Sequence, residues 1–283
     1  VPSRLACGSC HTGVDFVSGV GHKEGAQPDD SKCSVCHTPT KIDAVHASNT
    51  STPNNPIIPV GASNMAYTLV AAQVIAENAL QIDFSLLRDG TPMDVLNLPV
   101  DLTENNRYPS FLFAYALPQG GIQIPSDYNN LGQAAGQPSS AGIGDLVADG
   151  KVEALGDGVF RATVADAFPP DGGMRAVAIQ GYFRQTIPGT MDYWSRPATS
   201  QVVTVTGDSA RRDVVAINKC LSCHETIEGH GANRVDNEQV CVFCHNPNLT
   251  SSGRVADPAG LPQATIDALG NNPLLFPEEG MNF

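Results

Sequence analysis

The sequence is poor in positive charge. It has 16 Lys and Arg against 29 Asp and Glu, which gives a formal net charge of -13 at pH 7. A protein that binds nucleic acid neutralises phosphates with clustered basic side chains. This balance excludes a general nucleic-acid binder and favours partners that present positive charge, metal ions or flat surfaces.

Long apolar runs are also missing. No stretch reaches 18 apolar residues, so we expect no transmembrane segment in this chain. The chain starts at Val1 without a basic and apolar leader, and we expect any export signal or lipid anchor to have been removed or to lie outside it. Aromatic residues make up only 6%, against 27 Gly and 21 Pro. This composition favours short elements and long loops over long helices.

Cysteine is absent outside four CxxC pairs, and each pair is followed directly by histidine. In c-type haem attachment two cysteines bind the ring covalently, and the adjacent histidine reaches the iron from one face. The sequence therefore predicts four covalently attached haems c, with His11, His37, His224 and His245 as proximal ligands. The motifs are Cys7-Gly8-Ser9-Cys10-His11, Cys33-Ser34-Val35-Cys36-His37, Cys220-Leu221-Ser222-Cys223-His224 and Cys241-Val242-Phe243-Cys244-His245.

Two other interpretations of the cysteines compete with haem. The spacings would suit a pair of four-cysteine zinc knuckles, one formed by the first two motifs and one by the last two. Zinc, however, does not require the histidine. Redox-active dithiols are a second alternative, but they do not usually come four to a chain, and they lack an obligatory following histidine.

Three further histidines, His22, His46 and His230, each lie near a motif, and none lies between His46 and Cys220. We predict that they are distal haem ligands. Iron held by two histidines is saturated, so such haems relay electrons rather than bind substrate. Three distal ligands leave one haem short: Met281 could serve, that haem could be open, or a histidine could lie beyond Phe283. The sequence does not tell which distal histidine serves which iron.

The motifs divide the chain into three predicted parts. Residues 1–50 form a dihaem segment, residues 51–210 a β-sandwich or split-barrel domain, and residues 211–283 a second dihaem segment. The predicted fold class is a mainly β central domain flanked by loop-rich multihaem c-type cytochrome segments with short helices. Turns are expected at Asp89-Gly90 and Gly156-Asp157-Gly158. Loops are expected at 119–150 and 185–198, and strands at 67–76, 80–88, 110–117, 152–155, 159–164, 175–184 and 201–206.

The second half of the chain contains Arg211-Arg212-Asp213-Val214-Val215, Lys219-Cys220-Leu221-Ser222-Cys223-His224, His230-Gly231-Ala232-Asn233-Arg234 and Cys241-Val242-Phe243-Cys244-His245-Asn246-Pro247. With these strings it resembles the outer-surface decahaem c-type cytochromes of metal-reducing bacteria, the OmcA/MtrC type. The first two motifs, with His22 and His46, resemble the close of a haem domain in that family, and Gly90-Thr91-Pro92 and Gly156-Asp157-Gly158 resemble its split-barrel domain. The resemblance implies an internal haem–β-domain–haem portion or a small tetrahaem relative.

By that resemblance the chain would be an electron carrier rather than an enzyme, acting as an extracellular conduit to minerals, metals, flavins or other cytochromes. Its partners would be other multihaem cytochromes or an outer-membrane porin–cytochrome complex, with self-association a further expectation. Its place would be the outer-membrane surface or the extracellular space, with the periplasm as alternative. The chain departs from the family in having only four motifs and no cysteine between His37 and Cys220 for the β-domain disulfide of some members.

Two other functions remain open on the sequence. One is a multihaem reductase in which the haem without a distal histidine binds substrate. The other makes the β domain an adhesive or assembly module, with the haems as structural crosslinks.

Overall fold

The computed structural model describes residues 2–47, 58–75, 78–133, 136–187, 189, 193–195, 197–222, 224–246 and 262–268. The chain forms two compact units, Val1–Ile58 and Pro59–Phe283, and each is described by itself. The second unit contains both the predicted β segment and the last two CxxCH motifs. The division into a β domain and a separate second dihaem segment stays a prediction.

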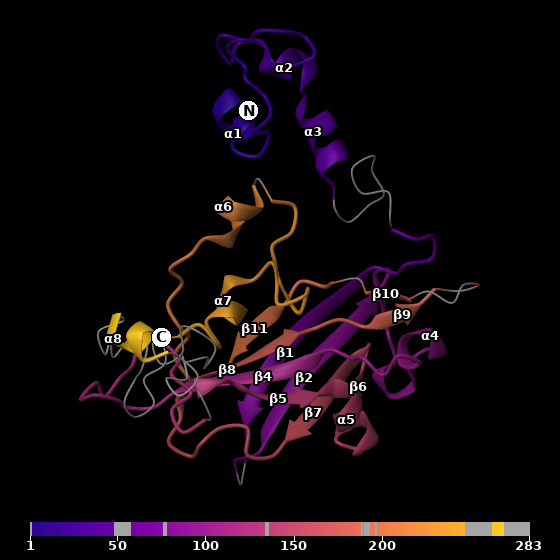
Figure 1. The fold of residues 1–283 in the computed structure, drawn as a ribbon. Helices are drawn as coiled ribbons and strands as arrows, with labels where there is room; N and C mark the ends of the chain where they lie inside the picture. Colours follow the sequence, from indigo (N-terminus) through magenta and orange to yellow (C-terminus); the bar gives the residue numbers. More distant parts are fainter. Residues whose placement is uncertain are drawn as a thin grey trace. The chain divides into compact units, whose positions relative to one another are not determined.

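The first unit is built from short helices joined by turns (Figure 1). The helices are α1 (Arg4–Gly8), α2 (Cys33–Cys36) and α3 (Pro39–His46). The α3 helix begins after Thr38, whose side chain accepts a hydrogen bond from Lys41 N, and proline stands in its first turn, where its missing N–H costs nothing. Within residues 2–47 only Pro2 is buried. This described part therefore has no apolar core of its own.

The second unit contains two antiparallel sheets (Figure 1). The first sheet has the order β1-β2-β7-β6, with β3 paired to β2. Burial in β2 alternates along the strand, which is typical of a sheet with one face in the core. The strands are β1 (Met65–Val74), β2 (Leu80–Arg88), β3 (Thr91–Pro92), β6 (Val152–Gly156) and β7 (Val159–Val164).

The second sheet has the order β11-β8-β4-β5. In β4 every residue after Ser110 is buried, so this strand is covered on both faces. One face packs toward the first sheet, and the other is covered by residues of the fourth CxxCH motif. The strands are β4 (Ser110–Ala116), β5 (Ser139–Gly142), β8 (Gly173–Gln180) and β11 (Gln201–Thr204).

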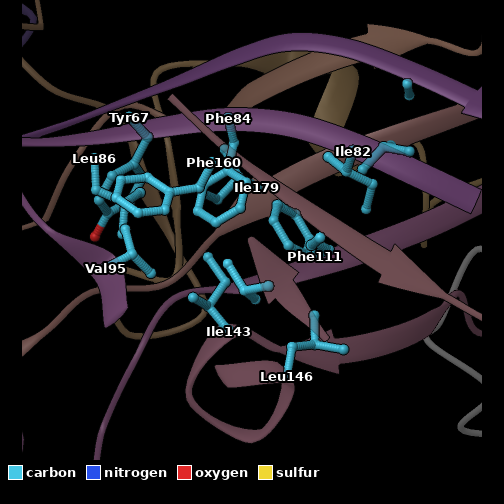
Figure 2. Close-up of a cluster of buried hydrophobic side chains, with 14 of the residues drawn as sticks. Tyr67, Ile82, Phe84, Leu86, Val95, Phe111, Ile143, Leu146, Phe160 and Ile179 are labelled. Atoms are coloured by element: carbon cyan, nitrogen blue, oxygen red, sulfur yellow. The ribbon is translucent and has the colours of Figure 1, made fainter. Parts of the chain in front are cut away.

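Aromatic and branched side chains from both sheets meet in the core (Figure 2). Phe84 of the first sheet packs edge-to-face on Phe111 of the second, with ring centroids 5.2 Å apart. Along one edge β1 lies beside β11, and the N–H of Thr206 donates to the carbonyl of Ala72 at 2.8 Å. The fold is mainly β, with antiparallel sheets and few short helices, as the sequence predicted.

Short elements complete the second unit. No helix in the described part of the chain is long and apolar enough to cross a membrane. The two remaining strand pairs are β9 (Arg184–Thr186) with β10 (Tyr193–Ser195), and β12 (Glu228–Gly229) with β13 (Arg234–Val235). The remaining helices are η2 (Val95–Asn97), α4 (Val100–Thr103), α5 (Ile143–Ala148), α6 (Ile217–Leu221), α7 (Glu238–Cys241) and α8 (Gln263–Ala268).

Both predicted hairpin turns are present. Asp89 and Gly90 have φ of 51° and 78°, and Asp157 and Gly158 have φ of 52° and 74°, as a turn with two left-handed residues requires. A Cβ at Gly158 would lie 2.4 Å from Pro92 Cβ. The second turn therefore needs glycine for close approach as well as for its backbone angle.

Several strand predictions were wrong in detail. The segment 185–198, expected as a loop, contains β10, and 119–150 contains β5 and α5. The strand expected over 175–184 is split into β8 and β9. The split falls at Gly181, whose φ is 89° and whose N–H bonds to Asn233 O instead of continuing the ladder. The first strand begins two residues before the predicted start, and residue 76 lies outside the described residues.

Candidate functional site

The first unit brings its four histidines together in two pairs. The His11 and His46 rings have centroids 6.1 Å apart and planes at 85°. The His22 and His37 rings are 6.2 Å apart with planes at 46°. In each pair, one histidine follows a CxxC sequence and the other is a predicted distal ligand.

The second unit contains one such pair. The His230 and His245 rings are 6.0 Å apart with planes at 33°. His224, the histidine of the third motif, is exposed. All seven histidines lie within the described residues, and the other six form the three pairs. The structure therefore leaves no histidine as a partner for His224.

The spacing of the rings fits a metal shared by two imidazoles. Metal–nitrogen bonds of about 2 Å on both sides put the ring centroids about 6 Å apart, and each ring can rotate about its own bond. The seven described cysteines, all except Cys223, are free of disulfides and so remain available to bind a haem. Among the described residues, which include all four cysteines of the first two motifs, no group of three or more His, Cys, Asp or Glu could hold a metal ion, whereas a four-cysteine zinc site formed by those two motifs needs one. The arrangement fits haem.

Backbone carbonyls orient two of the predicted distal histidines. His22 Nδ1 lies 2.8 Å from the carbonyl oxygen of Gly25, and His46 Nδ1 lies 2.9 Å from that of Ile42. A carbonyl oxygen only accepts hydrogen bonds, so Nδ1 carries the proton in both rings. Nε2 is then the nitrogen with a lone pair available for iron.

The loop that carries His22 depends on two glycines. Gly19 and Gly21 have φ of 82° and 76°. A Cβ at Gly21 would lie 2.4 Å from Gly13 O, and one at Gly19 would lie 2.4 Å from Ala26 N. Only glycine fits such close backbone contacts, so these residues hold the loop in the form that places His22 opposite His37.

The fourth motif is docked on the outer face of the second sheet. Phe243, between the two cysteines of the motif, is fully buried and packs edge-to-face on Tyr128 at 5.1 Å. The Asn130 side chain donates from Nδ2 to Phe243 O at 2.8 Å. Burial raises the pKa of the Cys241 and Cys244 thiols. The cluster comprises Leu112, Ala114, Tyr128, Ala176, Ala178, Val240 and Phe243.

An ion-pair cluster fixes the chain just before the third motif. Arg211 and Arg212 both contact Asp127, with nitrogen–oxygen distances of 2.8 and 2.9 Å. The Arg211 side chain is only 8% exposed, so its charge is paired in a largely buried place. Asp127 precedes Tyr128, the ring that receives Phe243, and burial raises the pKa of Tyr128 to about 12.

The loop with His230 is bound to the β sandwich at two places. Asn233 O accepts from Gly181 N at 2.8 Å, and Val235 O accepts from Ser200 N at 2.9 Å. His230 and His245 therefore both lie on segments held by the second sheet and its flanks. The sequence analysis missed Phe243, Asn130 and Asn233. The available signal was that Val242 and Phe243 are both apolar, whereas each of the other three motifs has a serine between its cysteines.

No family model matches the chain, and no curated protein matches it. The chain is similar to the crystal structure of MtrC from Shewanella baltica OS185, at 20% identity and a TM-score of 0.40, over 89% of this chain and 44% of that one. It therefore spans less than half of that structure's length. The chitinase ChiW from Paenibacillus sp. str. FPU-7 matches at 8% identity and a TM-score of 0.27, over 54% of this chain and 9% of that one.

Proposed function

We propose that this chain is a multihaem c-type cytochrome that binds four haems and relays electrons. One observation carries the proposal. Three of the four histidines that follow a CxxC sequence each face one further histidine, at 6.1, 6.2 and 6.0 Å. This pairing uses every histidine that the sequence holds outside the motifs.

The cysteines and paired histidines of the chain determine which chemistry a bound haem could perform. When bound, haem iron supplies one-electron redox chemistry. The two cysteines of a motif would bind the ring covalently, and the two histidines of a pair would bind the iron. Iron held in this way would leave a substrate no place to bind at these three sites. The residues therefore favour electron relay over bond-making chemistry.

The exposed apolar side chains of the first unit support the same proposal. Residues 2–47 have no buried side chain apart from Pro2. Flat, apolar haem rings would cover such side chains and supply the missing core. The exposed apolar residues are Leu5, Val17, Val20, Val35 and Val45.

We further propose an extracellular or outer-surface electron conduit. Its donors would be other multihaem cytochromes or an outer-membrane porin–cytochrome complex, and its acceptors metal oxides, soluble metals, flavins or further cytochromes. The motif strings shared with the outer-surface decahaem family support this assignment. The net charge of -13 favours positively charged or metallic partners.

The test is the haem content and its redox activity. The chain is produced in a host that attaches haem c, and its intact mass and potentiometric titration are measured. We expect the mass of four haems and reversible reduction by a low-potential donor. A Cys33→Ala, Cys36→Ala double variant should lose one haem. A chain without covalent haem, or with haems that no such donor reduces, would refute the proposal.

A second candidate function is a reductase whose third haem binds substrate. It is favoured by one observation: His224 follows a CxxC sequence, and the structure pairs all six other histidines with one another. An electron paramagnetic resonance spectrum decides. A high-spin signal that changes when substrate is added supports the reductase, and four low-spin haems exclude it.

A further inference from the structure

The loop with His230 has an unusual backbone. His230, Gly231 and Ala232 all lie in the left-handed region, with φ of 54°, 65° and 63°. A residue with a Cβ is disfavoured there, so such a run persists only when its surroundings hold it in place. The next residue, Asn233, provides that support.

Asn233 makes three hydrogen bonds, which together we call the Asn233 clasp. Its Nδ2 donates to His230 O at 2.7 Å. Its Oδ1 accepts from Arg107 Nη2 at 2.9 Å. Its backbone oxygen accepts from Gly181 N at 2.8 Å. The clasp thus closes the left-handed turn and ties it to the end of β8 and to the segment before β4.

The β-sandwich side of the clasp is itself held in place. The Arg107 guanidinium lies over the Tyr182 ring, 4.3 Å from its centroid, a favourable cation–π distance. Gly181 follows β8 directly. The clasp therefore joins the turn to residues that lie directly after β8 and just before β4.

The opposite ligand is fixed independently. His245 follows Phe243 and Cys244, and Phe243 is fully buried against the second sheet. With His245 held, freedom at the His230 turn would change the separation of the two rings instead of moving both together. The clasp thus holds the segment of the other partner, His230.

We propose that Asn233 is a positioning residue, which holds His230 at the distal axial position of the fourth haem. This inference rests on the proposed function, since it assumes that His230 and His245 bind one iron. Asn233 would act through the His230 backbone and would not touch the haem iron.

The test compares two asparagine variants of the haem-loaded chain. Asn233→Asp keeps the size of the side chain and its acceptor for Arg107, but replaces the donor to His230 O by an acceptor, which repels that carbonyl. Asn105→Asp is the matched control. Asn105 Nδ2 donates to Arg184 O at 3.2 Å and to Thr186 Oγ1 at 3.0 Å, also in the second unit and on backbone that carries no histidine.

The readout is carbon monoxide binding to the fully reduced protein, because an iron held by two histidines binds the gas only when one ligand leaves. We expect Asn233→Asp to raise the rate of carbon monoxide binding at the fourth haem about tenfold. This increase corresponds to a loss of about 1.4 kcal/mol from the free energy that holds His230 in place. Asn105→Asp should stay at the wild-type rate. Circular dichroism is used to check that both variants are folded. If Asn233→Asp does not fold, Arg107→Gln carries the test, with an increase of the same sign.

His230→Ala separates the two ways of failing. One outcome is that His230→Ala adds one carbon monoxide-binding haem, whereas Asn233→Asp and Arg107→Gln behave like the Asn105→Asp control. That outcome overturns the role of Asn233 and supports His230 and His245 as the ligand pair. If His230→Ala adds none, the ligand assignment beneath the proposed function is overturned instead.

Discussion

Replacing Phe243 by alanine tests whether the β sandwich holds the fourth motif. The side chain is fully buried, and its ring meets Tyr128 at 5.1 Å. A buried Phe→Ala change costs about 3–5 kcal/mol, which includes the loss of such an aromatic contact. The cluster lies on the outer face of a sheet, where neighbours can relax into the space. We therefore expect Phe243→Ala to lower the free energy of unfolding by about 3 kcal/mol.

The assay is urea unfolding of the haem-loaded chain, followed by the circular dichroism of the β sheets. Ser222→Ala is the matched control, because Ser222 occupies the same position in the third motif and is exposed. It should change the free energy of unfolding by no more than about 0.5 kcal/mol. A Phe243→Ala variant as stable as Ser222→Ala would refute the docking of this motif on the sheet.

Three further predictions follow from the same structure. Replacing the four cysteines of the first two motifs by alanine should leave residues 2–47 open to limited proteolysis, because within this range only Pro2 is buried. The β sandwich should stay resistant to the protease. Burial opposes the ionisation of Asp208, but hydrogen bonds from Arg175 outweigh it and lower the pKa of this carboxyl below 3.8. The pair therefore stabilises the fold above that pH and loses its effect as the pH falls below it, so thermal melts of Asp208→Asn should depend less on pH in acid than those of the wild type. The ring planes at 85° for His11–His46 and 33° for His230–His245 predict a highly anisotropic low-spin resonance that His46→Ala removes and a rhombic one that His230→Ala removes. Loss of the same signal in both variants would contradict the pairing.

Short apolar runs bounded by turn residues predicted the central strands well. The strands at residues 80–88 and 159–164 have the predicted bounds. The β5 strand was missed because Ser139–Gly142 is short, polar and at a sheet edge. The break after β8 was missed because it depends on a bond between Gly181 and Asn233, which are distant in sequence.

The candidate site, like the fold, was predicted from the sequence only in part. The CxxCH motifs are local, so the sequence alone gave the cysteines and the adjacent histidines as candidates. The pairing of His11 with His46 and of His22 with His37 requires the chain path between them, and the sequence left it open. Phe243 packs on the outer face of a sheet formed by β4 and β8. These strands are distant from the motif in sequence, so the residues of the motif alone do not predict the contact.

Spin quantitation of the fully oxidised chain tests the central claim most directly. Electron paramagnetic resonance counts low-spin and high-spin haems separately, and the intact mass gives the total. The pairs at 6.1, 6.2 and 6.0 Å predict three low-spin haems held by two histidines each. The remaining haem, at His224 of the third motif, would have a second ligand that is none of these histidines. Fewer than three low-spin haems per chain would contradict the account.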